Sequence, residues 1–451
     1  MSHTYNISLA SLKNSLKKQP DRLPMIERTK ESITKFRAGD IEFYYDNYDN
    51  GIYSSNMEPV SLVAEPTEEY KQVIKETRSR VKSNKPFWIR ILLGHACNYD
   101  CDYCMQKDIG NPDEREKITT TEYFIEQLSK LDMSRLQKID LWGGETFLYW
   151  KTMVEIMTSF DREGLTWFIP TNGTPLSMKH IEFFKTLKST VTIGISHDGP
   201  GHERLRGEEF LHKKVDILKA AQQVDNIKFS FNPVLSRTNY DLIAINDFFY
   251  KFAKENDLDM NKLALSWGVG HNYDYDNASG SAHHVIAGES LADFKNILDR
   301  YMDANIEQYY HNINNGIINN SLFHGGMGVL PYVQTLKQQI LPTSTTSCGV
   351  DDEGVLSIDM KGNIRTCPHT DESFIGGHIE KLEEVKLKRV DLERYENHCK
   401  SCEVFRLCKS NCPIEVPDNV FFTNCAIEKV YHRAVQLYAF RLIFGTEVVK
   451  E

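Results

Sequence analysis

Residues 87–106, FWIRILLGHACNYDCDYCMQ, join a short apolar segment to a loop that holds three cysteines. Six of the first eight residues are aromatic or aliphatic, which is typical of a buried β-strand. Cys97, Cys101 and Cys104 follow with the spacing C-x3-C-x2-C. Three thiolates hold three corners of a four-iron cluster and leave one iron open. The alternative is a zinc site that His95 completes as the fourth ligand.

The strand at residues 87–94 is the first of a series. Strand-like segments occupy residues 87–94, 138–144, 165–173, 190–199, 227–235 and 262–270. Helix-like segments lie between them at residues 119–133, 149–164, 178–188 and 208–224. This alternation predicts an α/β fold with a parallel sheet and crossover helices. Six units are too few for a closed eight-stranded barrel, so we expect a partial (β/α)6 barrel with its chemistry at the carboxyl ends of the strands.

The composition excludes several classes of protein. The chain has 451 residues and a formal net charge of −10, which gives a nucleic-acid partner no electrostatic support. It contains no run of about 18 apolar residues that would span a membrane, and the N-terminus lacks the apolar core of a secretory signal. We therefore expect a cytoplasmic protein whose cysteines serve metal or redox chemistry rather than disulfides.

The ten cysteines fall into two groups, because residues 105–347 contain none. The second group has seven members, which are Cys348, Cys367, Cys399, Cys402, Cys408, Cys412 and Cys425. Residues 355–367 alternate around a Lys361-Gly362-Asn363 turn and predict a hairpin within this group. Residues 426–444 predict an amphipathic helix after its last cysteine.

The three-cysteine loop, with Tyr103 just before its last cysteine, resembles the signature of the radical S-adenosylmethionine (SAM) superfamily. The resemblance implies that Cys97, Cys101 and Cys104 hold a [4Fe-4S] cluster whose open iron binds SAM. In that family one electron from the cluster cleaves SAM, and the resulting 5′-deoxyadenosyl radical abstracts a hydrogen atom from the substrate. The resemblance also implies that Tyr103 packs near the adenine.

Other predicted strand ends carry motifs that are similar to those of the same family. The second strand ends in a Gly-Gly-Glu, which in the family meets the SAM amino group, and glycine lets a ligand approach the backbone closely. The fourth strand is followed by a Ser-x-Asp-Gly-Pro motif and then by His202 and Arg206. The residues that the resemblance implies as SAM contacts are Tyr103, Gly143, Gly144, Glu145, Ser196, Arg206 and Asn232. A plain strand-end turn and a solvated arginine are the alternatives, and the pair His283-His284 is expected on the surface.

The seven C-terminal cysteines are similar to the SPASM extension of radical SAM enzymes, which holds two auxiliary [4Fe-4S] clusters. The ligands implied for auxiliary cluster I are Cys348, Cys367 and Cys412. The ligands implied for auxiliary cluster II are Cys399, Cys402, Cys408 and Cys425. Cluster I therefore has an open iron or a ligand other than cysteine, and Asp351, Asp352 and His369 are the candidates near its cysteines in sequence.

The resemblance covers residues ~87–425 and indicates the chemistry better than the substrate. Because SPASM enzymes mostly modify peptides, we predict an enzyme that crosslinks or otherwise modifies a ribosomally made precursor peptide, with flavodoxin or ferredoxin as reductant. Pro368 stands where sulfatase maturases carry an Asp, which disfavours formylglycine formation. Formylglycine formation, small-molecule dehydrogenation and a non-catalytic electron carrier are the alternatives. No catalytic residue is assigned.

The chain divides into four parts on these patterns. Residues 1–86 form an N-terminal region of suitable length for recognising a leader peptide by strand addition, and residues 41–55 predict a hairpin within it. Residues 87–310 form the partial barrel, and residues 311–343 a bridging region that follows a helix at 294–314. Residues 344–451 form the SPASM domain with its C-terminal helix.

Overall fold

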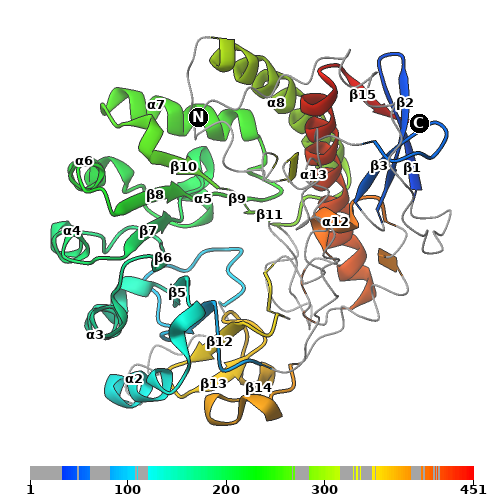
Figure 1. Cartoon of the computed structure of the whole chain (residues 1–451). Coiled ribbons are helices and arrows are strands. Elements are labelled where there is room, and N and C mark those ends of the chain that lie inside the picture. Colours follow the sequence, from blue (N-terminus) through cyan, green and yellow to red (C-terminus); the bar gives the residue numbers. More distant parts are fainter. Residues whose placement is uncertain are drawn as a thin grey trace.

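The computed structural model describes residues 33–47, 50–60, 82–106, 109, 120–266, 268–269, 284–314, 329, 332–333, 336, 348–350, 352–387, 398–399, 402–409, 412, 414 and 417–451. A nine-stranded sheet dominates this part of the chain, and it has the strand order β10-β8-β7-β6-β5-β4-β12-β13-β14. In Figure 1 the sheet curves as a crescent with helices along its outer side.

Six neighbouring strands of this sheet are parallel and form the predicted partial barrel. They are β4 (Trp88–Leu92), β5 (Lys138–Trp142), β6 (Thr166–Thr171), β7 (Thr190–Ile195), β8 (Ile227–Phe231) and β10 (Leu263–Leu265). The outer helices are α2 (Thr121–Ser129), α3 (Trp150–Phe160), α4 (Met178–Lys185), α6 (Val215–Gln222) and α7 (Leu242–Glu255). Two further strands, β9 (Val234–Leu235) and β11 (Gly268–Val269), pair with each other in parallel. All six predicted strands and the fold class are thus confirmed.

The register of the barrel strands explains which face carries the core. Ile89 of β4 aligns with Ile139, Trp167 and Val191 of the next three strands, and all four side chains are fully buried. They belong to one continuous apolar core with the outer helices. The next position of β4 is Arg90, whose side chain therefore points to the opposite face of the sheet.

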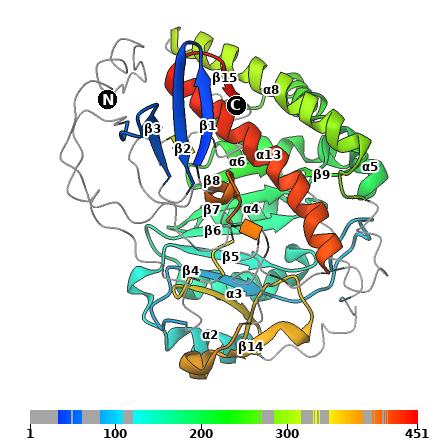
Figure 2. The same ribbon diagram turned by 90° about the vertical axis from the view of Figure 1, so that its right-hand side faces the viewer.

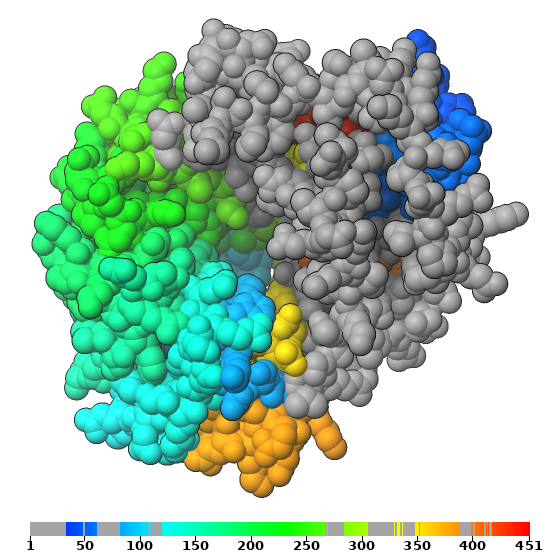
Figure 3. All heavy atoms as spheres, viewed as in Figure 1, coloured from blue at the N-terminus to red at the C-terminus, as the bar shows by residue number. Residues whose placement is uncertain are grey.

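The cysteine-rich C-terminal part continues the barrel sheet rather than forming a separate one. Strand β12 (Val355–Asp359) pairs in parallel with β4, so that Val355 aligns with Trp88. Strands β13 (Asn363–Arg365) and β14 (Ile375–His378) then extend the sheet antiparallel. The predicted hairpin is present, and Gly362 at its turn has φ +88°, a conformation that favours glycine. In Figure 3 this yellow and orange segment lies at the lower end of the cyan and green barrel.

The N-terminal strands and the C-terminal helix pack against each other. Strands β1 (Ile33–Ala38), β2 (Ile41–Asp46) and β3 (Gly51–Ser54) form a sheet with β15 (Val448–Lys450), in the order β15-β1-β2-β3. Phe43 of β2 contacts Phe440 and Phe444 of helix α13 (Asp418–Phe444), with ring centroids 5.3 and 4.5 Å apart. Figure 2 shows this sheet beside α13. The predicted hairpin at 41–55 is present as β2 and β3.

The remaining helices differ in part from the sequence prediction. Helix α13 begins at Asp418, eight residues earlier than predicted, directly after Pro417. Helix α8 (Glu289–Asn314) is five residues longer at its start than predicted, whereas α6 is shorter than the predicted 208–224 segment. The short helices are α5 (His202–Leu205), α12 (Phe405–Cys408) and the 3-10 helices at Met133–Arg135, Thr146–Tyr149, Gly199–Gly201, Leu211–Lys214, Met260–Lys262, Glu372–Phe374 and Ile379–Glu384. Among the described helices, none is both long and apolar enough to cross a membrane.

Candidate functional site

The three-cysteine loop leaves the carboxyl end of β4 and folds back on itself. The backbone N–H of Cys104 donates to the carbonyl of Cys101 at 3.1 Å, and that of Tyr99 donates to Sγ of Cys97 at 3.4 Å. Burial, together with the neighbouring thiols of Cys104 and Cys97, raises the pKa of Cys101 to about 12. All ten cysteines are free thiols. The loop therefore gathers three thiols at one place, as a shared metal centre requires.

The Gly-Gly-Glu at the end of β5 holds this loop in position. The N–H of Gly144 donates to the carbonyl of Gly94 at 3.0 Å, and that of Glu145 donates to the carbonyl of Ala96 at 2.8 Å. A Cβ on Gly144 would lie 2.3 Å from the carbonyl oxygen of His95. Only glycine permits this approach. The motif thus fixes the start of the cysteine loop against the neighbouring strand.

The carboxylate of Glu145 joins the ends of β5 and β6. It is buried and accepts hydrogen bonds from the N–H of Phe147 at 3.0 Å, the hydroxyl of Thr171 at 2.7 Å and the N–H of Asn172 at 2.6 Å. Burial raises the pKa of Glu145, and these three donors oppose the rise. The side chain therefore braces two strand ends, and it leaves the backbone of the Gly-Gly-Glu turn as the part that can contact a ligand.

A buried acid, Asp198, connects the cysteine loop to the ends of β7 and β8. Its Oδ2 accepts hydrogen bonds from the hydroxyl of Tyr103 at 2.5 Å and from Nε of Arg206 at 2.9 Å. Its Oδ1 accepts from the N–H of Val234 at 2.9 Å. The guanidinium carbon of Arg206 lies 5.2 Å from the centre of the Tyr103 ring. One carboxylate thus organises two of the predicted SAM contacts.

The electrostatics of this group favour a charged arginine and a neutral tyrosine. Burial is the largest single cause and disfavours the charged guanidinium of Arg206, but Asp198, Tyr103 and Cys101 together outweigh it, so the pKa of Arg206 is raised. Burial is the main cause that raises the pKa of Tyr103 well above its usual value. Arg206 also lowers the pKa of Cys101, which places its positive charge near the thiols. The arrangement suits an anionic group bound beside the cysteine loop.

Two further predicted SAM contacts lie at neighbouring strand ends. The N–H of Ser196 donates to the carbonyl of Thr171 at 2.7 Å, and the N–H of Asn232 donates to the carbonyl of Ile195 at 2.8 Å. The Oδ1 atom of Asn232 is buried and has no hydrogen-bond partner within the described part of the chain. A buried acceptor without a partner is costly. This atom therefore fits a bound donor such as a ribose hydroxyl or an amine.

Sequence reasoning missed two features of this site. Asp198 was noted only as part of a motif, although it is the residue on which Tyr103 and Arg206 converge. His284 was expected on the surface, but it is half-buried and its ring centroid lies 6.0 Å from that of Tyr103. His283 lies outside the described residues. The Ser-x-Asp-Gly-Pro motif was the available signal for Asp198, whereas nothing local in the sequence pointed to His284.

The structure brings two of the three cysteines predicted for auxiliary cluster I together around Arg90. Nη2 of Arg90 donates to the backbone carbonyl of Cys348. Burial raises the pKa of Cys367 to about 11, the Cys348 thiol raises it further, and the charge of Arg90 lowers it. Arg90 is also 3.9 Å from the carboxylate of Asp140. Cys412 is half-buried, and its sequence neighbours lie outside the described residues.

The four cysteines predicted for auxiliary cluster II lie close together. The N–H of Cys402 donates to the carbonyl of Cys399 at 3.0 Å. Burial raises the pKa of Cys408 well above its usual value, and the thiols of the other three cysteines add to the rise. Phe405 and Phe421 pack against this group. Four thiols grouped at one site match the donor set of a [4Fe-4S] cluster.

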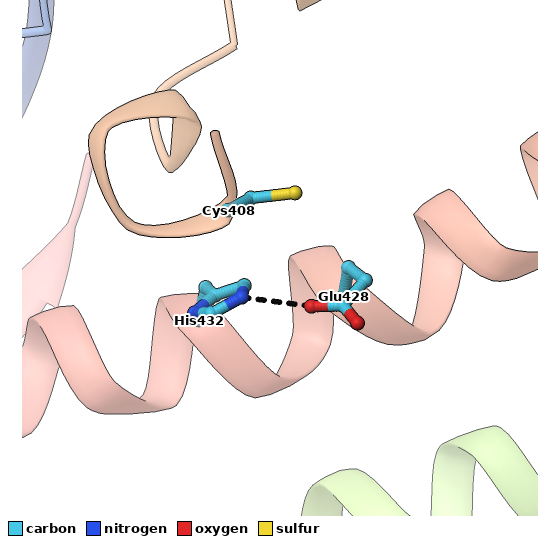
Figure 4. A group of neighbouring side chains, drawn as sticks. All are labelled: Cys408, Glu428 and His432. Carbon is cyan, nitrogen blue, oxygen red and sulfur yellow. Dashed lines mark ion pairs between the residues drawn. The ribbon is translucent and has the colours of Figure 1, made fainter. Parts of the chain in front are cut away.

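An acid and a histidine of α13 lie beside Cys408 and were not predicted. The Oε2 atom of Glu428 lies 2.7 Å from Nε2 of His432. The ligand atoms of both residues and of Cys408 lie within 4.8 Å of one another (Figure 4). This mixed thiol, carboxylate and imidazole group can hold a divalent cation, or it can lie against a cluster bound by Cys408.

A partial parallel barrel with grouped thiols and polar strand ends fits an α/β protein that holds a metal centre beside a polar ligand. Comparison with known proteins specifies the class. Residues 91–244 match the family model described as the radical SAM superfamily. Residues 91–244 thus carry a radical SAM domain, and the resemblance noted in the three-cysteine loop is confirmed. This domain implies SAM and one [4Fe-4S] cluster as cofactors.

Individual relatives agree with this classification. The chain is 22% identical over 377 residues to the radical SAM cyclopropyl synthase TigE of Paramaledivibacter caminithermalis, covering 76% of this chain and 72% of that protein. The solved structure of native anSMEcpe with bound AdoMet is 16% identical with a TM-score of 0.53, over 79% of this chain and 98% of that chain. A structure of anSMEcpe with AdoMet and the Cp18Cys peptide is also 16% identical, with a TM-score of 0.52 over 79% of this chain and 98% of that chain. These structures share the fold.

Proposed function

We propose that this enzyme abstracts a hydrogen atom from a peptide and thereby crosslinks or otherwise modifies a ribosomally made precursor. When bound and reduced, the cluster supplies the electron that cleaves SAM to methionine and a 5′-deoxyadenosyl radical. Cys97, Cys101 and Cys104 hold that cluster at the carboxyl end of β4. The hydrogen-bonded group of Asp198, Tyr103 and Arg206 is the observation that carries the proposal.

Residues at several strand ends bind different parts of SAM. The backbone of Gly143–Glu145 approaches the amino group, and Gly144 lets the start of the cysteine loop pack against this turn. Arg206 is held by Asp198 through Nε, which leaves its two Nη groups as donors for a carboxylate or ribose. Ser196 and the buried Oδ1 of Asn232 meet the remaining polar atoms. Tyr103 packs near the adenine and closes the site against water.

The proposal also includes a peptide as the substrate and two auxiliary clusters. The bound peptide in the anSMEcpe structure shows that a barrel of this fold admits a peptide. The name of the cyclopropyl synthase relative favours carbon–carbon bond formation within the substrate as the modification. The seven C-terminal cysteines would hold clusters I and II, which would supply redox chemistry between the substrate and an external carrier such as flavodoxin or ferredoxin. Formylglycine formation is disfavoured because Pro368 stands where sulfatase maturases carry an Asp.

Two measurements test this proposal. Iron and sulfide analysis of the anaerobically reconstituted chain should give about twelve irons, from three four-iron clusters. A content of about four irons, or zinc instead of iron, would contradict the auxiliary clusters.

Coexpression with a short peptide encoded beside this gene, followed by mass spectrometry, should show the loss of two hydrogens for a crosslink. No change in any such peptide, together with turnover of a small molecule, would contradict the peptide substrate.

A further inference from the structure

Auxiliary cluster I has three cysteine ligands and needs a fourth. We propose that His369 is this ligand, an inference that rests on the proposed cluster and specifies its ligand set. Imidazole replaces thiolate as an iron ligand in some iron–sulfur proteins, where two histidines bind one iron of a [2Fe-2S] centre. Cys367 and His369 are separated by one residue, so both can reach a single cluster.

The position of His369 supports this role. Its backbone N–H donates to Sγ of Cys367 at 3.5 Å. The guanidinium of Arg90 donates to the carbonyl of Cys348 and acts electrostatically on both Cys367 and His369. Cys348, Cys367 and His369 therefore all lie near the same cation. A cluster held by three thiolates is anionic, and this buried arginine lies where it can balance that charge.

The ring of His369 is fixed and available for a ligand. It packs edge-on against Trp142 at the carboxyl end of β5, with ring centroids 4.6 Å apart. Its nitrogens make no hydrogen bond to any residue in the described ranges.

The other candidates fit less well. The carboxylate of Asp352 accepts a hydrogen bond from the N–H of Gly354 at 2.8 Å, and the backbone carbonyl of Asp352 accepts from Nζ of Lys82 at 2.8 Å. Both contacts shape the turn that enters β12. Asp351 lies outside the described residues. In Asp352 one carboxylate oxygen is thus held by the turn, whereas neither imidazole nitrogen of His369 is held by a hydrogen bond in the described part of the chain.

The test uses the full chain with Cys97, Cys101 and Cys104 replaced by Ala, which leaves only the auxiliary clusters. Histidine is labelled with ¹⁵N in the imidazole, the clusters are reduced, and pulsed EPR detects nitrogen coupled to iron. We expect the coupling of a directly bound nitrogen in this protein and its loss in His369→Gln. His212→Gln removes an exposed histidine from the barrel surface and should leave the signal unchanged. His369→Cys should keep the iron and lose the nitrogen signal.

Each contrary outcome has its own meaning. About eight irons without nitrogen coupling, or coupling that persists in His369→Gln, overturns the ligand assignment and leaves the proposed clusters intact. Loss of coupling in His432→Gln instead places the nitrogen at cluster II and also overturns the assignment. An iron content of about four per chain would mean that this variant holds only one auxiliary cluster. That result would contradict the proposed function as well as the assignment of His369 as a ligand.

Discussion

The hydroxyl of Tyr103 donates a hydrogen bond to Oδ2 of Asp198 at 2.5 Å, which joins the cysteine loop to the end of β7. The same oxygen accepts from Nε of Arg206, whose side chain is also buried. Because both donors share this oxygen, the position of the loop and the orientation of the arginine depend on one carboxylate.

Asp198→Ala should destabilise the fold and weaken SAM binding. The change leaves the buried Arg206 guanidinium without its carboxylate, and breaking a buried pair in this way costs about 3–5 kcal/mol. Urea unfolding measures the free energy, and equilibrium dialysis measures SAM affinity. The exposed Asp216 of α6 provides the control, since Asp216→Ala should change stability by less than about 0.5 kcal/mol. Equal effects of the two substitutions would argue against the role given to Asp198.

Gly144→Ala should displace the cysteine loop. Its Cβ would lie 2.3 Å from the carbonyl oxygen of His95, and the resulting strain costs about 1–3 kcal/mol. The iron content should fall from about twelve to about eight per chain, because one four-iron cluster loses its site. Gly268→Ala is the matched control, since a Cβ there meets nothing within 4 Å. Full iron content in Gly144→Ala would show that the loop tolerates the shift.

His202 should make the fold sensitive to mild acid. Burial lowers its pKa to about 4, and His197 and Arg206 add to the effect. The unfolded chain binds this proton near pH 6.5, so it binds more protons than the folded chain between pH 6.5 and 4. Stability therefore falls as the pH falls through this window, by about 3 kcal/mol at most. Urea unfolding at pH 7 and pH 5 measures the loss.

The variant His202→Phe should lose less stability between pH 7 and pH 5 than the unchanged chain. His212→Phe removes an exposed histidine and should leave the pH dependence unaltered. Glu209 does not affect this comparison between pH 7 and pH 5. Its pKa is lowered to about 2, so the stability that it contributes is lost only below pH 4.5. An identical pH dependence in His202→Phe would contradict the assignment.

The contact between Phe43 and Phe440 should couple the N-terminal sheet to the C-terminal helix. Each ring is fully buried, so either change to Ala should cost about 3–5 kcal/mol. The double variant should cost less than the sum of the two, with a coupling of about 0.5–3 kcal/mol. Urea unfolding of the four proteins measures it. Strict additivity would mean that the two elements fold independently.

Much of the barrel was predictable because its information is local. Strands β4 to β8 are short apolar segments with β-branched residues, and their alternation with helices gives the parallel order directly. The start of α13 was missed because Asp418 to Cys425 includes polar residues and the last cysteine, which resemble the preceding loop. The pairing of β12 with β4 joins residues far apart in the chain, and no local pattern encodes it.

The candidate site also has features that local sequence predicts and features that depend on the three-dimensional fold. The spacing of the cysteines and the Gly-Gly-Glu turn are local patterns, and they pointed to the correct family. The convergence of Tyr103 and Arg206 on Asp198 depends on how three strand ends meet in space. His284 was misjudged for the same reason, since its burial comes from packing against Tyr103 and not from its polar neighbours in sequence.

The proposal that the three-cysteine loop holds a cluster that cleaves SAM is tested most directly by the formation of 5′-deoxyadenosine. This product is measured by liquid chromatography after the anaerobically reconstituted chain is reduced with dithionite in the presence of SAM. We expect 5′-deoxyadenosine and methionine from the unchanged chain and none above background from Cys101→Ala. No 5′-deoxyadenosine from the iron-loaded unchanged chain, or equal amounts from both proteins, would contradict the proposal.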